Sequence, residues 1–289
     1  MPAVGDMLLS LMICTYKRKK ELKDVIKTLS PLPREVEIVL VDQNSVNERV
    51  SREELVETGL DSDQLTIVYR DLGSLSSARN EGFKRCKGDF IGFPDDDNYY
   101  EPSFRERIVA KLDSIRHDIN CGGVILNWRA FRGFPKSDRK MKRSESLRYG
   151  NSGTLVVRRD IVCQELGMRP FPEDMSPGTR YPAGDETYFL ACLLKESGLD
   201  MVAAPDIYID HPVFPETNER ERVYGYGLGA LAYKLIVLGW GPGFIYAIKL
   251  LIGPLVKIFA LPLKGRSSRI GWIMLHRRWK GAIDYYRSS

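Results

Sequence analysis

Three consecutive carboxylates, Asp95, Asp96 and Asp97, are the residues of this sequence best suited to chemistry. They follow the apolar run 90–93, which suits a buried strand, and Pro94, which cannot donate a hydrogen bond to a strand ladder. Adjacent carboxylates repel one another, and a bound divalent cation is the simplest compensation. In an extended backbone Asp95 and Asp97 share one face, which suits Mg²⁺ or Mn²⁺. The alternative is an acidic turn that caps the next helix.

Short apolar runs recur upstream of this cluster, and helical patterns separate them. The runs are 7–14, 36–41, 65–69 and 90–93. This alternation predicts right-handed crossovers and a mainly parallel, Rossmann-like α/β sheet with helices on both faces. Ligands of such sheets bind beyond the carboxyl ends of the strands. That edge carries Thr15, Tyr16, Asp42, the loop at Gly73 and the acidic cluster.

Length and composition are typical of a globular protein. The chain has 289 residues and a formal net charge of +5, enough for one large domain or a domain with an appendage. Its five cysteines are widely spaced and form no C-x-x-C pair, which indicates reduced thiols in a cytosolic protein. No basic residue precedes the apolar run 7–13, so we interpret it as a core strand and not as a signal peptide.

Four segments carry a family resemblance: LMICTYKR, EIVLVDQNS, SLSSARNEG and GDFIGFPDDDNYYEP. In this order and at these intervals they resemble the nucleotide-sugar-binding half of a family 2 glycosyltransferase with the GT-A fold. The resemblance covers about the first hundred residues. It implies a nucleotide-sugar donor, held on Mg²⁺ or Mn²⁺ by the D-x-D carboxylates Asp95 and Asp97.

The residue chemistry at the sheet edge fits such a donor. Asp42 can accept the ring N–H of a uracil-type base, and the ring of Tyr16 can pack on the base; a turn or helix cap is the alternative for Asp42. Arg79 can reach the ribose or the diphosphate, or form an ion pair on a helix surface. We therefore expect the donor to be bound by Thr15, Tyr16, Asp42, Arg79, Asp95 and Asp96.

A second acidic pair, Asp185 and Glu186, begins a predicted helix, where the helix dipole alone can explain it. Glycosyl transfer with inversion needs one carboxylate that removes a proton from the acceptor hydroxyl. The position resembles one in family 2 enzymes, which usually carry Glu-Asp there, with the Asp as base. Here the order is Asp-Glu. By position Glu186 inherits the role and by residue type Asp185 does. The resemblance also makes His211, after the closing strand, a candidate metal ligand beside Asp95 and Asp97.

The C-terminal region concentrates the positive charge. From residue 223 on, ten Lys or Arg face one acid, Asp284, and residues 224–263 are mostly apolar but interrupted by Gly and Pro. We expect two amphipathic helices lying on a membrane surface through residues 224–280, because a spanning helix needs about 20 uninterrupted apolar residues. A helical cap on the catalytic domain or a homodimer interface is the alternative. The expected domains are 1–222 and 223–289.

A basic segment, 129–148, is expected to be a solvated loop or, alternatively, a mobile arm that contacts an anionic acceptor or the leaving diphosphate. Nucleic-acid binding is not expected, because no recognised module surrounds this segment.

Together these features predict an inverting, metal-dependent glycosyltransferase at the cytoplasmic face of the cell membrane. Its expected donor is a UDP-sugar, and its expected acceptor a saccharide, lipid-linked, in surface polysaccharide synthesis. A phosphatase of the haloacid dehalogenase type, a sugar nucleotidyltransferase and a non-catalytic membrane-docking protein on a decayed glycosyltransferase fold are the alternatives.

Overall fold

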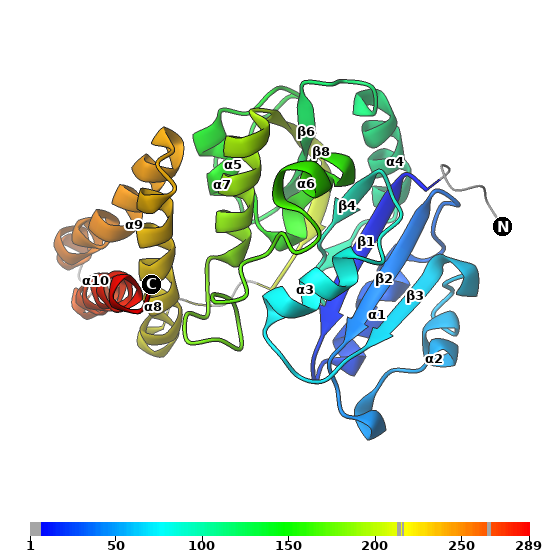
Figure 1. Cartoon of the computed structure of the whole chain (residues 1–289), viewed down its shortest axis with the longest axis horizontal. Helices are drawn as coiled ribbons and strands as arrows, with labels where there is room; N and C mark the ends of the chain where they lie inside the picture. The colour runs from blue at the N-terminus through cyan, green and yellow to red at the C-terminus, as the bar shows by residue number, and fades with distance from the viewer. Residues whose placement is uncertain (1–6, 213–214, 216, 265–266) are drawn as a thin grey trace. The chain divides into compact units, whose positions relative to one another are not determined.

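The computed structural model describes residues 7–212, 215, 217–264 and 267–289. Arg266, one of the basic residues counted in the tail, lies outside them. The chain forms two compact units, and Figure 1 shows the elements of both in chain order. The first unit comprises Met1–Gly73, Ser77–Pro170 and Glu196–Val213, and the second comprises Ser74–Ser76, Phe171–Lys195 and Phe214–Ser289.

An eight-stranded sheet forms the first unit, in the order β3-β2-β1-β4-β7-β6-β8-β5. Its strands are β1 (Leu9–Thr15), β2 (Val36–Asp42), β3 (Leu65–Tyr69), β4 (Phe90–Gly92), β5 (Tyr99–Tyr100), β6 (Cys121–Trp128), β7 (Leu155–Arg158) and β8 (Asp200–Asp210). Strands β1 to β4 pair in parallel, as do β6 and β8. The predicted α/β fold of the GT-A type is thus confirmed, but the sheet is mixed.

Strand β7 is the main departure from a parallel sheet, since it runs antiparallel to both β4 and β6. After β6 the chain returns to the sheet without a crossover, so β7 runs back from the end at which β6 stopped. Strand β5 pairs antiparallel with β8 and has only two residues, too few to produce a periodic sequence signal.

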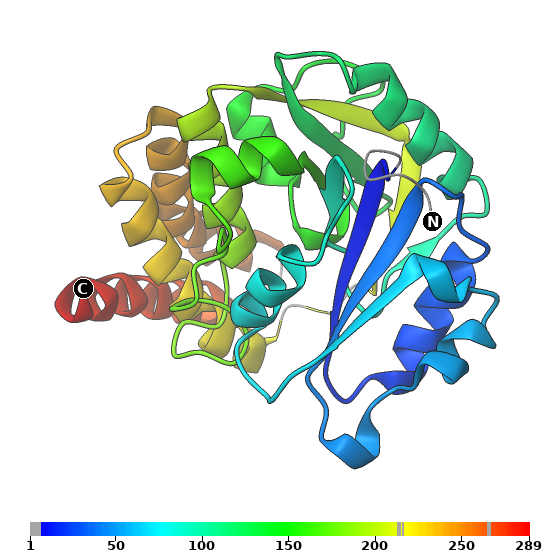
Figure 2. The same ribbon diagram turned by 45° about the vertical axis from the view of Figure 1, so that its right-hand side comes forward.

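Helices cover both faces of the sheet, as predicted. The helix α1 (Lys19–Leu29) buries Leu22, Val25, Ile26 and Leu29 in the same core as the odd-numbered residues of β1. On the other face, Gly82 of α3 (Leu75–Phe83) lies against Met12 and Val41. Figures 1 and 2 show α1 and α3 on opposite sides of strands β1 to β3. Further helices are α2 (Arg52–Val56), α4 (Phe104–Ile115), α5 (Arg143–Tyr149), α6 (Arg159–Leu166) and α7 (Asp185–Ser197).

The segment 129–148 is only partly a loop, because its last residues begin α5. The rings of Phe131 and Phe134 pack on Tyr149, with centroids 5.1 and 5.3 Å away. Arg139 also pairs with Glu145, 2.8 Å away. The expectation of a solvated loop is therefore wrong for residues 143–148, and a mobile arm stays a prediction.

Three long helices dominate the second unit: α8 (Asn218–Val237), α9 (Gly241–Ala260) and α10 (Arg269–Ser288). They lie side by side in Figure 1. Helices α8 and α10 approach closely because both carry glycine at the crossing. A Cβ at Gly229 would lie 2.0 Å from Arg278 O, and one at Gly281 would lie 2.0 Å from Tyr226 O.

The expectation that Gly and Pro break the 241–260 region into short pieces is wrong, because α9 continues through Pro254. Proline has no N–H, so the carbonyl of Leu250 loses its usual helical donor. The guanidinium of Arg278 replaces that donor, with its Nη1 2.9 Å from Leu250 O. Among the described residues α9 alone is long and apolar enough to cross a membrane, and 28% of its most apolar window is buried. This is weak evidence for membrane association.

Candidate active site

The carboxyl ends of three neighbouring strands bring the predicted site residues of the first unit together. Thr15, at the end of β1, pairs in register with Asp42, at the end of β2. Beyond β4, Asp95 forms an isolated parallel bridge with Cys14. The acidic cluster therefore lies at the same sheet edge as the loop after β1.

Asp95 is held in place by three neighbours. Its two carboxylate oxygens lie 2.9 and 2.8 Å from the hydroxyl of Ser152, which donates to them. Arg79 Nη2 is 3.4 Å from Asp95 Oδ1, and the Arg79 residue is only 3% exposed. The backbone N–H of Asp95 donates to the side chain of Asn98 over 2.6 Å. Arg79 thus forms a buried ion pair, and not the helix-surface pair given above as its alternative.

Asp96 has partners in the loop after β1 and shares one of them, Arg18, with Asp97. The Thr15 hydroxyl donates to Asp96 Oδ2 over 2.8 Å, and Arg18 Nη1 lies 3.2 Å from Asp96 Oδ1. Burial raises the pKa of Asp96 to about 6, although Thr15 and Arg18 act in the opposite direction. Asp96 therefore holds the loop after β1 against the acidic cluster.

His211 faces Asp97 and Asp95. Its Nε2 lies 3.2 Å from Asp97 Oδ1 and 3.9 Å from Asp95 Oδ2. Its Nδ1 lies 2.9 Å from the carbonyl oxygen of Pro212, which can only accept, so Nδ1 carries a proton and donates it. In the neutral imidazole the lone pair of Nε2 therefore points toward two carboxylates. The nearby Asp97 raises the pKa of His211, against the opposing effect of burial.

Asp97 is buried, and one of its oxygens has no hydrogen bond while His211 is neutral. Arg18 Nη1 donates to Asp97 Oδ2 over 2.5 Å, whereas Oδ1 faces Nε2 of His211, 3.2 Å away, which can donate to it only when the imidazole is protonated. Burial acts to raise the pKa of Asp97, yet His211 and Arg18 outweigh it and hold this pKa below its usual range. A buried oxygen of this kind needs a partner, because an unsatisfied charged group is costly.

The side chains that converge here are of types that a divalent cation accepts. Oδ1 of Asp97, a carboxylate oxygen of Asp95 and Nε2 of His211 face one another, and Mn²⁺ accepts both carboxylate and imidazole ligands. Within the described part of the chain, however, no three His, Cys, Asp or Glu side chains are grouped so that they could hold a metal ion as they stand. The side chains would therefore have to adjust around an ion, and Arg18 occupies part of the carboxylate surface.

The side chain of Asp42 forms hydrogen bonds within the loop that follows β2. Its Oδ1 accepts hydrogen bonds from the backbone and side chain of Asn44, at 2.8 and 2.7 Å, and its Oδ2 accepts one from Val50 N at 2.9 Å. The residue is fully buried. These contacts are those of the turn alternative, and base recognition by Asp42 stays a prediction. Tyr16, by contrast, is 37% exposed and free to meet a planar ligand.

Asp185 and Glu186 lie in the second unit, where they begin α7. Asp185 is 3% exposed, and its Oδ2 accepts a hydrogen bond from Ser76 over 3.2 Å. Glu186 is half-buried and therefore the more accessible of the two. Their role as base stays a prediction.

The sequence interpretation missed Arg18 and Ser152, which contact the acidic cluster directly. Arg18 is the last residue of the LMICTYKR segment, and Ser152 lies in the small-residue loop before β7. Neither has a spacing that marks it, because both reach the cluster through the fold and not through the local chain.

The chain belongs to glycosyl transferase family 2, whose model matches residues 10–168, including the strands and the acidic edge described above. The match covers more than half of the chain, which decides against the phosphatase and nucleotidyltransferase alternatives. Family members of similar sequence include the uncharacterized glycosyltransferase EpsJ of Bacillus subtilis (strain 168), 28% identical over 118 residues. That alignment covers 40% of this chain and 33% of EpsJ, so the chain matches about a third of that relative's length.

Solved structures show the same fold. The S. aureus TarS 1-349 structure in complex with UDP-GlcNAc has a TM-score of 0.61 and 18% identity, and the match covers 98% of this chain and 90% of TarS. The mannosyltransferase PcManGT of Pyrobaculum calidifontis, in complex with GDP-Man and Mn²⁺, has a TM-score of 0.65 and 14% identity, with 97% and 87% covered. At these identities the likeness concerns the fold.

Proposed function

We propose that this protein is an inverting, metal-dependent glycosyltransferase that moves a hexosyl group from a nucleotide-sugar, a UDP-sugar, to a saccharide acceptor. One observation carries the proposal. Asp95, Asp97 and His211 converge at the carboxyl edge of the sheet, and a buried oxygen of Asp97 faces Nε2 of His211 and has no donor when that imidazole is neutral. The UDP-GlcNAc and the GDP-Man with Mn²⁺ bound to the two structural neighbours support this choice of donor and metal.

Asp95, Asp97 and His211 would hold Mg²⁺ or Mn²⁺, which supplies positive charge for the leaving diphosphate. Arg79 would stabilise the same charge, because its buried guanidinium already lies beside Asp95. Thr15 and Asp96 would keep the loop after β1 in position, so that the exposed ring of Tyr16 can pack on the nucleotide base.

Glu186 would take the proton from the acceptor hydroxyl. Asp185 is the alternative base, but it is buried and accepts a hydrogen bond from Ser76. A general base must reach the proton that it removes, and the half-buried Glu186 meets that condition better.

We further propose a lipid-linked saccharide as acceptor, surface polysaccharide synthesis as the process, and peripheral binding to the cytoplasmic membrane face. Support comes from α9, whose exposed apolar side chains include Phe244, Val256 and Phe259, at 48%, 68% and 72% exposure. The net positive charge of α10 favours an anionic membrane surface.

Two variants test the reaction. Asp97→Ala should lose Mn²⁺-dependent binding of UDP-sugars, measured by calorimetry with and without the ion, because it removes a proposed metal ligand. Glu186→Gln should keep donor affinity but lose transfer by about 10²-fold or more, since it keeps the shape and removes the base. The exposed Asp63→Ala is the matched control for the loss of one carboxylate.

Unchanged metal-dependent donor binding in Asp97→Ala would contradict the metal site. Full transfer activity in Glu186→Gln would move the role of base to another residue, and Asp185→Asn would be measured next.

A further inference from the structure

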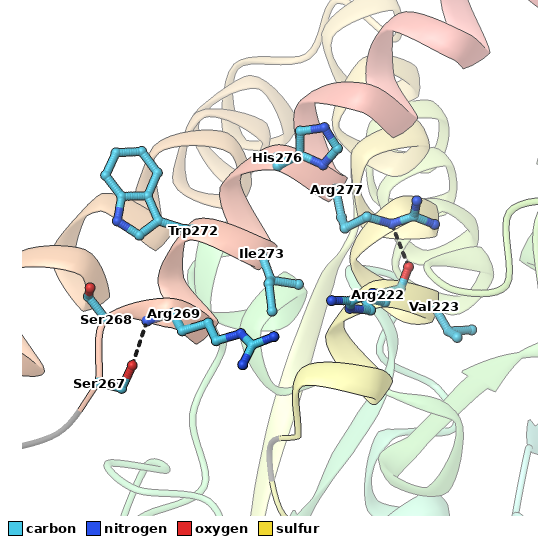
Figure 3. A pocket seen from close by; sticks show the side chains of 9 residues that line it. All are labelled: Arg222, Val223, Ser267, Ser268, Arg269, Trp272, Ile273, His276 and Arg277. Carbon is cyan, nitrogen blue, oxygen red and sulfur yellow. Dashed lines mark hydrogen bonds between the residues drawn. The ribbon is translucent and has the colours of Figure 1, made fainter.

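A basic pocket of about 810 Å³ lies in the second unit, between the start of α8 and the start of α10. Its polar lining comprises Arg222, Ser267, Ser268, Arg269 and Arg277, together with His276. Figure 3 shows the side chains of Arg222 and Arg269 extending toward one another from the two helices. None of these residues belongs to the proposed catalytic site.

Among the described residues, the arginines that line the basic pocket, Arg222, Arg269 and Arg277, have no acidic partner in an ion pair. Arg277 is positioned by its Nε, which donates to Arg222 O over 2.6 Å, and its guanidinium lies 4.9 Å from the centre of the Tyr226 ring. The guanidinium groups of Arg222 and Arg269, which extend toward one another, repel each other, and an anion between them would relieve this repulsion.

Two acids of α8 and α10 are engaged elsewhere. Glu221 lies 3.8 Å from Arg278, and Asp284 lies 2.8 Å from Lys280 and accepts a hydrogen bond from Tyr226. Glu219, three residues before Arg222 in the first turn of α8, is an exposed carboxylate outside the pocket lining. Among the described residues, the lining itself includes three arginines and no acid.

The start of α10 adds hydrogen-bond donors. The side chain of Ser268, at the N-terminal cap, makes no capping hydrogen bond, although the Ser267 hydroxyl accepts one from Arg269 N over 3.2 Å. The positive end of the α10 dipole thus meets the same pocket as the three arginines. Arginine and a helix N-terminus together suit a phosphate group.

Apolar side chains contribute to the pocket and to the neighbouring end of α9. Trp272 lines the pocket and is 57% exposed, and Phe259 and Leu263, near the end of α9 and outside the lining, are 72% and 88% exposed. Helices α9 and α10 approach each other closely at this point, because a Cβ at Gly271 would lie 2.8 Å from Ile258. A phosphate site bordered by exposed tryptophan and aliphatic side chains matches a lipid headgroup better than a soluble anion.

We propose that the basic pocket binds the phosphate of an anionic membrane phospholipid, while Trp272 and the apolar end of α9 enter the region of the acyl chains. This inference rests on the membrane association proposed above and gives it a specific ligand. It does not depend on glycosyl transfer, so binding can be measured without a sugar nucleotide.

Vesicle flotation tests the basic pocket with the full-length protein. Neutral phosphatidylcholine vesicles report the apolar contribution, and vesicles that also contain phosphatidylglycerol report the added effect of the anionic lipid. The double variant Arg222→Gln/Arg269→Gln should lose roughly 20-fold of the anionic partitioning, since each basic residue near an anionic surface contributes about fivefold. The control Arg34→Gln/Arg287→Gln removes the same charge from exposed positions outside the pocket and should lose much less.

A second comparison tests the apolar contribution of Trp272. Trp272→Ala should weaken binding to the vesicles, whereas Trp279→Ala, on the same helix and outside the pocket lining, should not. Circular dichroism and thermal unfolding check that each variant is folded. Support would be an anionic preference that only the pocket variants lose.

Four results would overturn the inference. Equal losses in the pocket and control variants would mean general attraction of charge. Equal binding to neutral and anionic vesicles would mean that the phosphate is not recognised, and absence of binding to either would refute the membrane association itself. Stabilisation by free pyrophosphate that equals the effect of the vesicles, and that is lost in Arg222→Gln/Arg269→Gln, would assign the pocket to a soluble anion. A failure of metal-dependent donor binding would leave these results untouched.

Discussion

At the scale of single residues, Arg18 and His211 compete for the environment that a metal ion would use. Arg18 pairs with Asp96 and Asp97, while Nε2 of His211 lies near Asp97 from another side. The Arg18 side chain is 44% exposed and can move away at little cost in burial. Arg18 therefore balances the negative charge of the carboxylates without blocking the approach of an ion.

Replacing Arg18 tests this competition. In Arg18→Gln we expect Mn²⁺ to bind several-fold more tightly in the absence of nucleotide, because the ion no longer displaces or faces a guanidinium. Calorimetric titration with Mn²⁺ measures the change, and Lys20→Gln, an exposed cation nearby in sequence, is the control. Weaker Mn²⁺ binding in Arg18→Gln would show that the arginine organises the carboxylates instead of competing for them.

The sequence anticipates the carboxylates at the edge but not their partners. The run 90–93 and the next three Asp predict an acidic strand end from local pattern alone, and the resemblance adds His211. Ser152 and Arg18 reach the cluster from positions 57 and 79 residues away, and such distant contacts leave no local periodicity. The partners of Asp42, by contrast, were indicated by the local sequence. The turn residues that follow it predicted hydrogen bonds of the kind that the structure shows.

At the scale of elements, the glycine crossing of α8 and α10 determines how the three C-terminal helices pack. The two glycines leave space for a backbone carbonyl of the partner helix in each case. Alanine at either position would place its Cβ 2.0 Å from that carbonyl. An exposed Gly→Ala substitution in a helix normally raises the free energy of unfolding by about 1 kcal/mol. The sign of the change in this free energy therefore distinguishes close packing from intrinsic helix propensity.

We predict that Gly229→Ala and Gly281→Ala each destabilise the fold by about 3 kcal/mol, because the helices must move apart. Gly253→Ala in α9 is the matched control, since nothing lies within 4 Å of the added Cβ, and it should be neutral or stabilising. Thermal or urea unfolding measures all three. A neutral Gly229→Ala would mean that the crossing is looser than described.

A second contact joins these helices to the segment before α7. Lys234 Nζ of α8 lies 3.0 Å from Asp174, and the hydroxyl of Tyr285 in α10 donates to the same carboxylate. Burial acts to raise the pKa of Asp174, but Tyr285 and Lys234 outweigh it and lower this pKa. Since the folded-state pKa lies below the unfolded one, ionised Asp174 stabilises the fold above the unfolded pKa. That contribution is lost as pH falls through the folded-state pKa.

Asp174→Asn should therefore lower the free energy of unfolding by about 1 kcal/mol near pH 7, a modest value because the carboxylate is nearly half exposed. The difference from the unchanged protein should shrink as pH falls below about 4, the usual range for Asp. Urea unfolding at a series of pH values measures it. A difference that does not depend on pH would show that the charge of Asp174 is not what matters.

The helices illustrate what sequence patterns predict well. The helical pattern expected between the first two apolar runs corresponds to α1, since its one buried face produces the regular apolar spacing. Gly and Pro wrongly suggested a break in α9, because the donor that compensates Pro254 comes from Arg278, 24 residues further along. A rule about local chain breaking cannot include a hydrogen bond from another helix.

At the scale of the whole molecule, the two compact units do not follow the order of the chain. The second unit includes residues 171–195 as well as the C-terminal helices. Within it, the Tyr181 ring stacks on Tyr226 at 5.3 Å, and the Leu231 side chain would lie 2.9 Å from a Cβ at Gly184. The predicted division into 1–222 and 223–289 remains untested as a functional boundary.

Truncation at that boundary tests it. A chain of residues 1–222 would leave the apolar surface of residues 171–195 without the partners that cover it in the second unit. We therefore expect it to aggregate, or to show rapid proteolysis and hydrogen exchange in that segment compared with the full chain. A well-folded, protease-resistant 1–222 that binds a UDP-sugar would show that the sequence-based division is the correct one.

The shared packing of residues 171–195 with the C-terminal helices also limits how such a protein can change over evolutionary time. The two segments are inherited as a matched pair, although more than twenty residues separate them along the gene. Recombination that replaced only one of these segments would join apolar surfaces that have not evolved to pack together. Viable chimeras should therefore exchange both segments together.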